Sequence, residues 1–249
     1  MLSSQQRRTP ESRTKHAKLL NAAALKTHYA VYGHFYSTNL AGEHCSCRSA
    51  LTLIRRDCIP SELAQLDALP PDLLVVMMNP GSSYPLDKAF TPPHIEAHAL
   101  GQAPRCWMAT KPDNTQYQIM RVMAAMGYQH GRILNISDLR ETKSPRLVAK
   151  VTALASHSEG GLHALFAPQR QAELHGLLGD DLNVPIVIGW GRHKGLLPLA
   201  RQAMTALQGR TLVGIEVEPL RYAHPSPMLQ VMKDAWLQTV IAHLSQLSQ

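Results

Sequence analysis

The chain has 249 residues, of which 45% are hydrophobic, so one α/β domain over residues 1–249 with a substantial core is expected. Its formal net charge of +7 and sequence pI near 9.4 favour a polyanionic partner. No apolar run reaches the roughly 18 residues of a spanning helix, and the basic N-terminus lacks the apolar core of a signal peptide. We therefore expect a cytoplasmic monomer that does not contact a membrane.

The first quarter of the chain gives weak structural signals. Residues 1–9 are polar and are expected to be flexible. Residues 10–30 alternate basic and apolar positions in a pattern that favours a helix. The basic side of this helix is expected to be either a solvated face or a DNA-contacting arm. Residues 32–57 are irregular, and we expect them to supply an outer strand.

Four cysteines raise the question of a metal site, but their spacing argues against one. Cys45, Cys47 and Cys58 cluster with His44, while Cys106 lies far downstream. Zinc and iron–sulfur clusters use such ligands, but this spacing matches no common ligand frame. Reduced thiols are ordinary in a cytoplasmic protein, so we expect no metal and no cofactor.

The centre of the chain contains a strand, a long loop and a helix. Residues 73–78 form a short apolar run typical of a buried parallel strand, which ends at Asn79. Residues 84–112 have no periodicity and five prolines, and are expected to form a lid or insertion loop over the strand ends. Residues 114–126 then predict a helix that ends at Gly127.

Three more strands are predicted at residues 132–136, 184–189 and 211–217, and a last helix at residues 229–247. Helical patterns lie between these strands. Because strands that alternate with helices favour parallel pairing with both faces covered, we expect a three-layer αβα fold with a central four-stranded parallel sheet. Ligands bind such sheets at the carboxyl ends of the strands.

Polar stretches follow the predicted strands. They read N-P-G-S-S from Asn79, L-N-I-S-D-L at residues 134–139, W-G-R-H-K-G at residues 190–195 and H-P-S-P from His224. This set, in this order, resembles the uracil-DNA glycosylase superfamily over about residues 73–230. The first stretch is similar to the mismatch-specific branch, the second and third to the uracil-specific branch, and H-P-S-P to the second signature motif. The resemblance implies a uracil-DNA glycosylase-like fold.

The resemblance also implies roles for three polar residues. Asn79 would hold the attacking water, His224 would donate a hydrogen bond to the base carbonyl, and Asn135 would read the edge of a flipped-out base. An amide cannot accept a proton as a carboxylate does, so Asn79 would position water rather than deprotonate it. The alternatives are an Asx-turn for Asn79 and an amide that braces neighbouring loops for Asn135.

The size of the accepted base depends on Gly81. In the uracil-specific branch a tyrosine at this place blocks substituents on the pyrimidine ring, whereas glycine leaves the space empty. Phe90 is the residue expected to stack on the base, with a packing role inside the lid as its alternative, and Tyr84 is a second choice for stacking.

Hydroxyl and basic side chains near the strand ends are expected to bind DNA phosphates. They are Ser82, Ser83, Arg192, His193, Lys194 and Ser226. For residues 192–194 the alternative is a solvated helix start. Met228 follows H-P-S-P at the place where the family carries an apolar wedge that fills the gap left by the flipped nucleotide.

The function expected from these features is a monofunctional DNA glycosylase that hydrolyses the N-glycosidic bond of a flipped-out modified pyrimidine and leaves an abasic site. Neither signature loop contains a lysine for lyase chemistry. A permissive pocket favours a bulky base such as glucosylated hydroxymethylcytosine, and hence an antiviral role against phage DNA. The alternatives are a repair glycosylase for uracil, thymine mispairs or etheno-adducts, a noncatalytic DNA-binding module, and an enzyme for free nucleosides.

Overall fold

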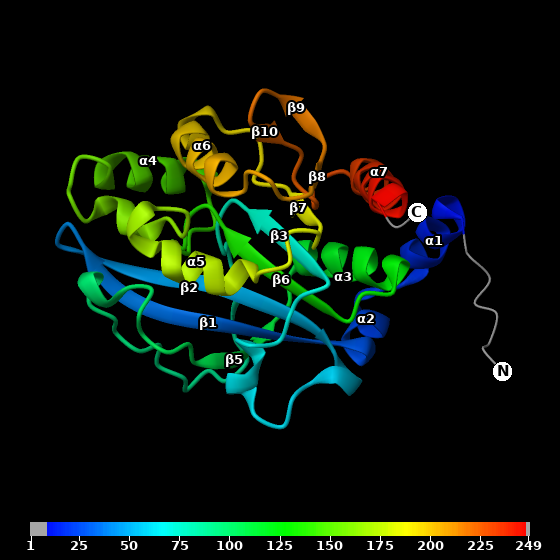
Figure 1. Cartoon of the computed structure of the whole chain (residues 1–249), viewed down its shortest axis with the longest axis horizontal. Helices are drawn as coiled ribbons and strands as arrows, with labels where there is room; N and C mark the ends of the chain where they lie inside the picture. The colour runs from blue at the N-terminus through cyan, green and yellow to red at the C-terminus, as the bar shows by residue number, and fades with distance from the viewer. Residues whose placement is uncertain (1–8, 248–249) are drawn as a thin grey trace.

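The computed structural model describes residues 9–247 as an α/β structure built on one large mixed sheet (Figure 1). Eight strands lie in the order β4-β5-β1-β2-β6-β3-β7-β8. The strands are β1 (Tyr29–Leu40), β2 (Glu43–Arg55), β3 (Leu73–Met77), β4 (Tyr84–Pro85), β5 (Trp107–Lys111), β6 (His130–Asn135), β7 (Ile186–Ile188), β8 (Leu212–Gly214), and the separate pair β9 (Glu216–Glu218) and β10 (Arg221–Tyr222). The helices are α1 (Pro10–Leu19), α2 (Ala22–His28), α3 (Asn114–Met126), α4 (Ser144–Leu154), α5 (Gln171–Leu178), α6 (Leu197–Ala206) and α7 (Gln230–Leu247).

The α/β class is confirmed, but the prediction of a four-stranded parallel sheet is wrong in extent. The four expected strands do pair in parallel as β6-β3-β7-β8. β2 then continues the sheet antiparallel to β6, and β1, β5 and β4 extend it with further antiparallel pairs. The sheet is therefore mixed and has eight strands.

The largest difference lies in residues 32–57, where an outer strand was expected. β1 and β2 form a long hairpin that places β2 beside the parallel strands, in the interior of the sheet. The hairpin is buried on both faces for much of its length, and its buried positions include polar residues such as Thr38 and Thr52. A strand buried on both faces does not alternate apolar and polar residues, so the usual strand signal is absent.

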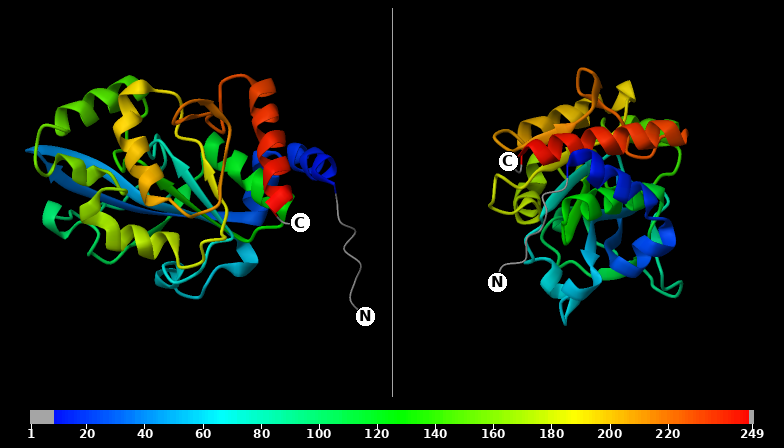
Figure 2. Two further views of the ribbon diagram at one scale, coloured as in Figure 1. Left: turned by 45° about the horizontal axis from the view of Figure 1, so that its top comes forward. Right: turned by 90° about the vertical axis from the view of Figure 1, so that its right-hand side faces the viewer.

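Helices cover both faces of the sheet, which makes three layers (Figures 1 and 2). Alternate residues of β3 enter opposite apolar clusters: Leu74 and Val76 pack with α4, α5 and α6, whereas Leu73, Val75 and Met77 pack with α1, α3 and α7. α3 begins with a capping box between Asp113 and Gln116 and ends at Gly127, as predicted, in a left-handed conformation.

Two other predictions need correction. The expected helix over residues 10–30 is two helices, because the chain is extended at Leu20 and at Asn21, which caps α2. Residues 84–112 are not a lid: β5 pairs with β1, β4 pairs with β5, and Ile95 donates a hydrogen bond to Ser37, so the segment extends the sheet edge. Of the expected flexible residues 1–9, residues 1–8 lie outside the described part.

Two buried histidines couple stability to pH. Burial is the main cause that lowers the pKa of both His130 and His163 to about 4. The folded pKa lies below the unfolded value near 6.5. The stability that each neutral histidine contributes to the fold is therefore fully present above pH 6.5 and is lost as the pH falls toward 4. We expect each histidine to cost about 2 kcal/mol of stability between pH 8 and pH 5.

Urea unfolding of the wild type and of His163→Asn at both pH values measures this effect. Asparagine can keep a hydrogen bond to the Ser137 hydroxyl, which lies 3.0 Å from His163 Nδ1, but it has no titratable group. The variant should lose less stability on acidification than the wild type. Equal losses in both proteins would show that His163 is not the titrating group.

Candidate functional site

A cavity of about 380 Å³ lies at the carboxyl ends of β3 and β6. It is lined by Arg48, Met77, Met78, Asn79, Pro80, Gly81, Asp113, Thr115, Gln116, Ile133, Asn135, Glu141, Thr142, Ser144, His224, Ser226, Pro227 and Met228. This volume falls within the roughly 300–1,000 Å³ of ligand sites. The cavity brings together the N-P-G-S-S and H-P-S-P stretches, which are far apart in the sequence.

Asn79 is held in one orientation. β3 places it at the strand end, and its Nδ2 donates hydrogen bonds to the carbonyl oxygens of Leu139 at 2.9 Å and Glu141 at 2.7 Å. Both acceptors lie in the loop after β6, which stays beside β3 because Ile136 and Ser137 donate to Met77 and Met78. The two donor bonds leave Oδ1 as the acceptor that Asn79 can offer to a water in the cavity.

His224 presents one nitrogen as a donor. The backbone N–H of Ser226 donates to His224 Nδ1 at 3.1 Å, so the proton of the neutral ring lies on Nε2. Burial is the main cause that lowers the pKa of His224, which favours the neutral ring. The loop is fixed just before it, because Ala223 donates to Ile215 and accepts from the Trp236 indole at 3.1 Å.

Asn135 is fully buried, and neither its Oδ1 nor its Nδ2 has a hydrogen-bond partner among the described residues. A buried polar side chain without partners costs about 1–3 kcal/mol. Because Asn135 lines the cavity, a bound ligand could satisfy both groups. This arrangement disfavours the alternative in which the amide braces neighbouring loops, since such an amide would be bonded to them.

Gly81 leaves open space in the cavity wall. Its φ is +60°, a left-handed conformation that L-residues rarely adopt, and a Cβ there would meet nothing within 4 Å. The open space that the sequence predicts beside Gly81 is therefore present in the structure. Met228 stands at the same cavity with 98% of its surface exposed, a costly position for an apolar side chain that packs against nothing.

Gly189 sets the position of the His224 loop. A Cβ at Gly189 would lie 2.8 Å from Cδ of Pro225, which follows His224 directly. We expect Gly189→Ala to push this loop outward and to cost about 1–3 kcal/mol of stability, as overpacking does. Ligand binding in the cavity should weaken as well, because His224 would move with the loop.

Thermal unfolding and a crystal structure of Gly189→Ala check this expectation. Gly176→Ala in α5 is the matched control, since a Cβ at Gly176 would meet nothing within 4 Å. An unshifted loop in the variant would contradict the expectation.

The structure does not bring seven of the predicted residues into the cavity lining: Ser82, Ser83, Tyr84, Phe90, Arg192, His193 and Lys194. Ser83 is buried with an unpartnered hydroxyl, so that hydroxyl is not available to a phosphate on the surface. Tyr84 lies on the outer strand β4 against Lys111, and Phe90 lies in the segment that extends the sheet edge. Neither aromatic residue lines this cavity. Residues 192–194 are exposed and follow β7, outside the lining.

Sequence reasoning missed seven polar residues of the lining: Arg48, Asp113, Thr115, Gln116, Glu141, Thr142 and Ser144. Asp113 and Gln116 form the capping box of α3, whose pattern is visible in the sequence. Arg48 is 2% exposed, and its Nε and Nη1 have no hydrogen-bond partner among the described residues. Burial, the largest cause, lowers the pKa of Arg48 to about 10, so the side chain is charged at pH 7.

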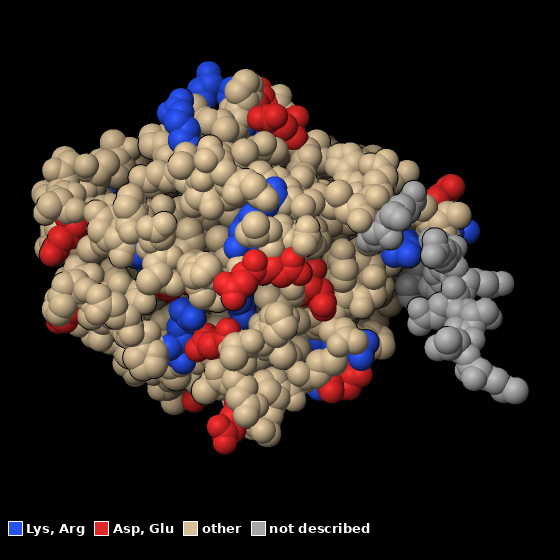
Figure 3. Space-filling view, viewed as in Figure 1, with Lys and Arg blue, Asp and Glu red and all other residues tan. Residues whose placement is uncertain are grey.

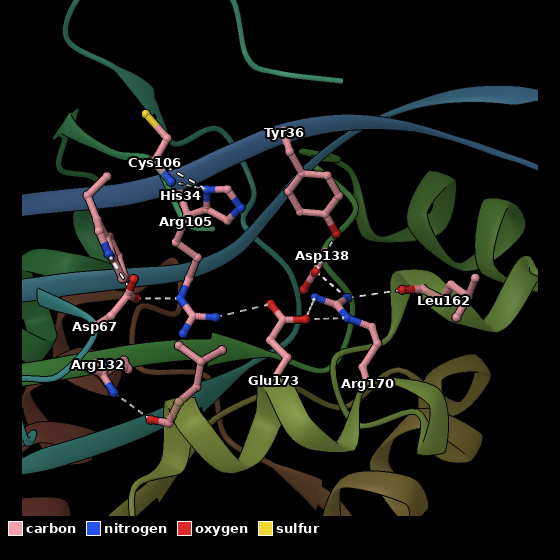
Figure 4. Close-up of polar contacts among 12 residues, drawn as sticks. His34, Tyr36, Asp67, Arg105, Cys106, Arg132, Asp138, Leu162, Arg170 and Glu173 are labelled. Atoms are coloured by element: carbon pink, nitrogen blue, oxygen red, sulfur yellow. Dashed lines mark hydrogen bonds and ion pairs between the residues drawn. The ribbon is translucent and has the colours of Figure 1, made fainter. Parts of the chain in front are cut away.

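A buried ion network includes Asp138 of the loop after β6 (Figure 4). Arg170 pairs with Asp138 at 2.5 Å and with Glu173 at 2.6 Å, and the Tyr36 hydroxyl donates to Asp138 at 2.7 Å. The Asp138 backbone carbonyl in turn accepts from the Arg48 backbone N–H at 2.9 Å. The network therefore fixes the loop after β6 and the middle of β2, two of the segments that line the cavity.

Charges of both signs are interspersed on the face shown in Figure 3. Lys and Arg side chains gather at its upper edge near α6, with acidic side chains beside them. Within residues 9–247 no helix has the length and hydropathy to cross a membrane. In the same residues no three His, Cys, Asp or Glu side chains come together as metal ligands; Cys45 and Cys47 are buried in β2, Cys58 is half-buried and Cys106 is exposed.

Comparison with known families, curated proteins and solved structures finds no match to this chain.

Proposed function

We propose that this protein is a monofunctional DNA glycosylase that takes a flipped-out modified base into the cavity and hydrolyses its N-glycosidic bond. The observation that carries the proposal is the convergence of Asn79, Asn135 and His224 on one cavity, with the Asn135 amide buried and unpartnered. Three polar groups with different hydrogen-bonding roles are what recognition and release of a base require. The uracil-DNA glycosylase-like fold belongs to this proposal.

The chemistry follows from the free hydrogen-bonding groups. The C1′–N bond breaks and its electron pair goes to the base, water adds through oxygen to C1′, and the water's second proton ends on the base. Asn79 Oδ1 would accept a hydrogen bond from that water, and His224 Nε2–H would donate to the base oxygen on which charge develops. An amide positions water without removing its proton, which predicts modest turnover.

DNA would be held by groups around the cavity. Met228 is exposed at the rim and would fill the space that the flipped nucleotide vacates, while Ser226 lines the cavity and would contact a phosphate. Extrusion of a base costs on the order of a few kcal/mol, which such a wedge offsets. The space at Gly81 supports a base larger than uracil, such as glucosylated hydroxymethylcytosine, and thereby an antiviral role.

The test is base release from matched oligonucleotides, single-stranded and duplex. They carry uracil, a thymine mispair, an etheno-adduct, hydroxymethylcytosine or its glucosylated form, and hot alkali reveals abasic sites. The matched variants are Asn79→Ala and Asn39→Ala, since Asn39 is an exposed asparagine of β1 outside the cavity. Release of one modified base by the wild type and Asn39→Ala, but not by Asn79→Ala, supports the proposal.

Two other outcomes would favour a different function for this protein. DNA binding without release of any base would favour a noncatalytic DNA-binding module. Cleavage of free nucleosides with no effect of DNA length or salt would favour a nucleoside hydrolase, because phosphate contacts make DNA binding salt-dependent.

A further inference from the structure

Arg48 is a buried cation without a counterion. No carboxylate among the described residues pairs with it within 4.0 Å, and two of its nitrogens lack hydrogen-bond partners. Burial of an ionised side chain that is neither paired nor hydrogen-bonded is strongly unfavourable. Arg48 also lines the cavity, so a ligand there could supply the missing negative charge.

A β-bulge turns Arg48 toward the cavity. In the β1–β2 register Ala50 pairs with His34 and Arg48 pairs with Phe35, so Ser49 is the extra residue. Without the bulge, Arg48 would share the face of Ala50, which packs against α4, α5 and α6. With it, Arg48 joins the face of Leu51, which packs against α3 and α7. Bulges near active sites often redirect a side chain in this way.

The bulge also places Arg48 beside Asn135. Ala50 of β2 pairs with Leu134 of β6, one residue before Asn135, and both polar side chains line the cavity. Arg48 offers only donors, whereas the Asn135 amide offers one donor group and one acceptor. A ligand edge that complements both must present a hydrogen-bond acceptor, such as an oxygen, to Arg48.

The charges around Arg48 are of both signs, because the carboxylates of Asp113 and Glu141 line the same cavity. Asp113 acts on Arg48 through its charge and raises its pKa, but no ion pair forms between them. Arg140, the other nearby cation, lowers the pKa of Arg48 through repulsion. The carboxylate of Asp138 is already paired with Arg170. Among the described residues Arg48 therefore has no direct ion-pair partner, although carboxylates lie around the same cavity.

We infer that Arg48 binds the departing base as an anion, through an exocyclic oxygen that faces it. This inference rests on the proposed glycosylase activity and names its substrate class: bases with a carbonyl or another oxygen group at the edge that enters the cavity. The electron pair of the broken C1′–N bond is delocalised onto that oxygen, where the guanidinium stabilises it. Arg48 is thus a catalytic residue in addition to Asn79 and His224.

The first test measures binding of free bases to the full chain by calorimetry at pH 7.5. The probes are 5-nitrouracil, whose ring is ionised at this pH, and uracil, whose ring is neutral. The wild type should bind 5-nitrouracil at least about 10-fold more tightly than uracil, and Arg48→Met should lose this preference. Arg201→Gln, an exposed arginine of α6, is the control and should behave as the wild type.

The second test is thermal unfolding of the same variants without ligand. Arg48→Met removes an unpaired buried charge, so its Tm should rise rather than fall. A lower Tm together with an unchanged preference for the anion would mean that Arg48 serves the fold, and would overturn the inference. A wild type that prefers neither base would overturn it too.

These measurements do not depend on catalysis. In one outcome the protein releases no base from DNA and still prefers the anion in a way that depends on Arg48. That result would support the anion site and contradict the glycosylase activity. Base release at the wild-type rate by Arg48→Met, with no anion preference in either protein, would keep the glycosylase and reject the role of Arg48.

Discussion

Replacement of His224 by alanine should slow base release by about 100- to 1,000-fold, the usual cost of losing one donor to a developing oxyanion. The ring is oriented for this task, because Ser226 donates to Nδ1 and leaves the proton on Nε2. The hydrogen bond becomes stronger as charge builds on the base, so kcat should fall more than KM rises. Single-turnover kinetics on the substrate found in the oligonucleotide panel measure the effect.

The control for this variant is His157→Ala, since His157 is exposed and lies outside the cavity lining. It should release base at the wild-type rate. A loss of less than 10-fold in His224→Ala would mean that other donors carry the negative charge, and Arg48 would then be the first to examine.

The pH profile of the wild type gives a second check on His224. Burial lowers the pKa of this ring below its usual value near 6.5, so the neutral form predominates down to that pH. Protonation would place a hydrogen on Nδ1, where it would face the N–H of Ser226. The midpoint of any acidic decline in base release should therefore lie below about pH 6.5. A decline already centred near pH 7 would contradict a lowered pKa.

The sequence predicts the centre of the site better than its surroundings. Apolar runs that stop at Asn79 and near Asn135 locate strand ends, and parallel strands bring such ends to one edge of a sheet. His224 follows a short strand pair and was found by its motif. For Asn79 and Asn135 the local sequence pattern is therefore sufficient to place each residue near the end of its strand.

The features that sequence reasoning missed depend on long-range pairing. Arg48 reaches the cavity only because Ser49 is an extra residue in the β1–β2 ladder, and nothing near Ser49 in the sequence marks a bulge. The prolines of residues 84–112 favour a loop, yet the segment contains β5, which is held by its partner β1 rather than by its own propensity. Phe90 lies in the same segment, outside the cavity lining.

Replacement of Asn79 by aspartate should reduce base release at least about 100-fold, although aspartate is the stronger base. The Asn79 amide donates to the carbonyl oxygens of Leu139 and Glu141 at 2.9 and 2.7 Å. A carboxylate accepts hydrogen bonds but cannot donate them, so its oxygen would face two other acceptors. Either the carboxyl becomes protonated and loses its basicity, or the loop after β6 moves away and the cavity opens.

Stability separates this explanation from a defect in chemistry alone. Two buried carbonyls that lose their donor should cost about 1–3 kcal/mol, so Asn79→Asp should unfold at a lower urea concentration than the wild type. Asn39→Asp, at an exposed position of β1, is the matched control and should be unaffected. Faster base release by Asn79→Asp would show that a carboxylate fits this place, and that the water needs a base rather than an orienting amide. Unchanged stability would show that the two donor bonds do not hold the loop.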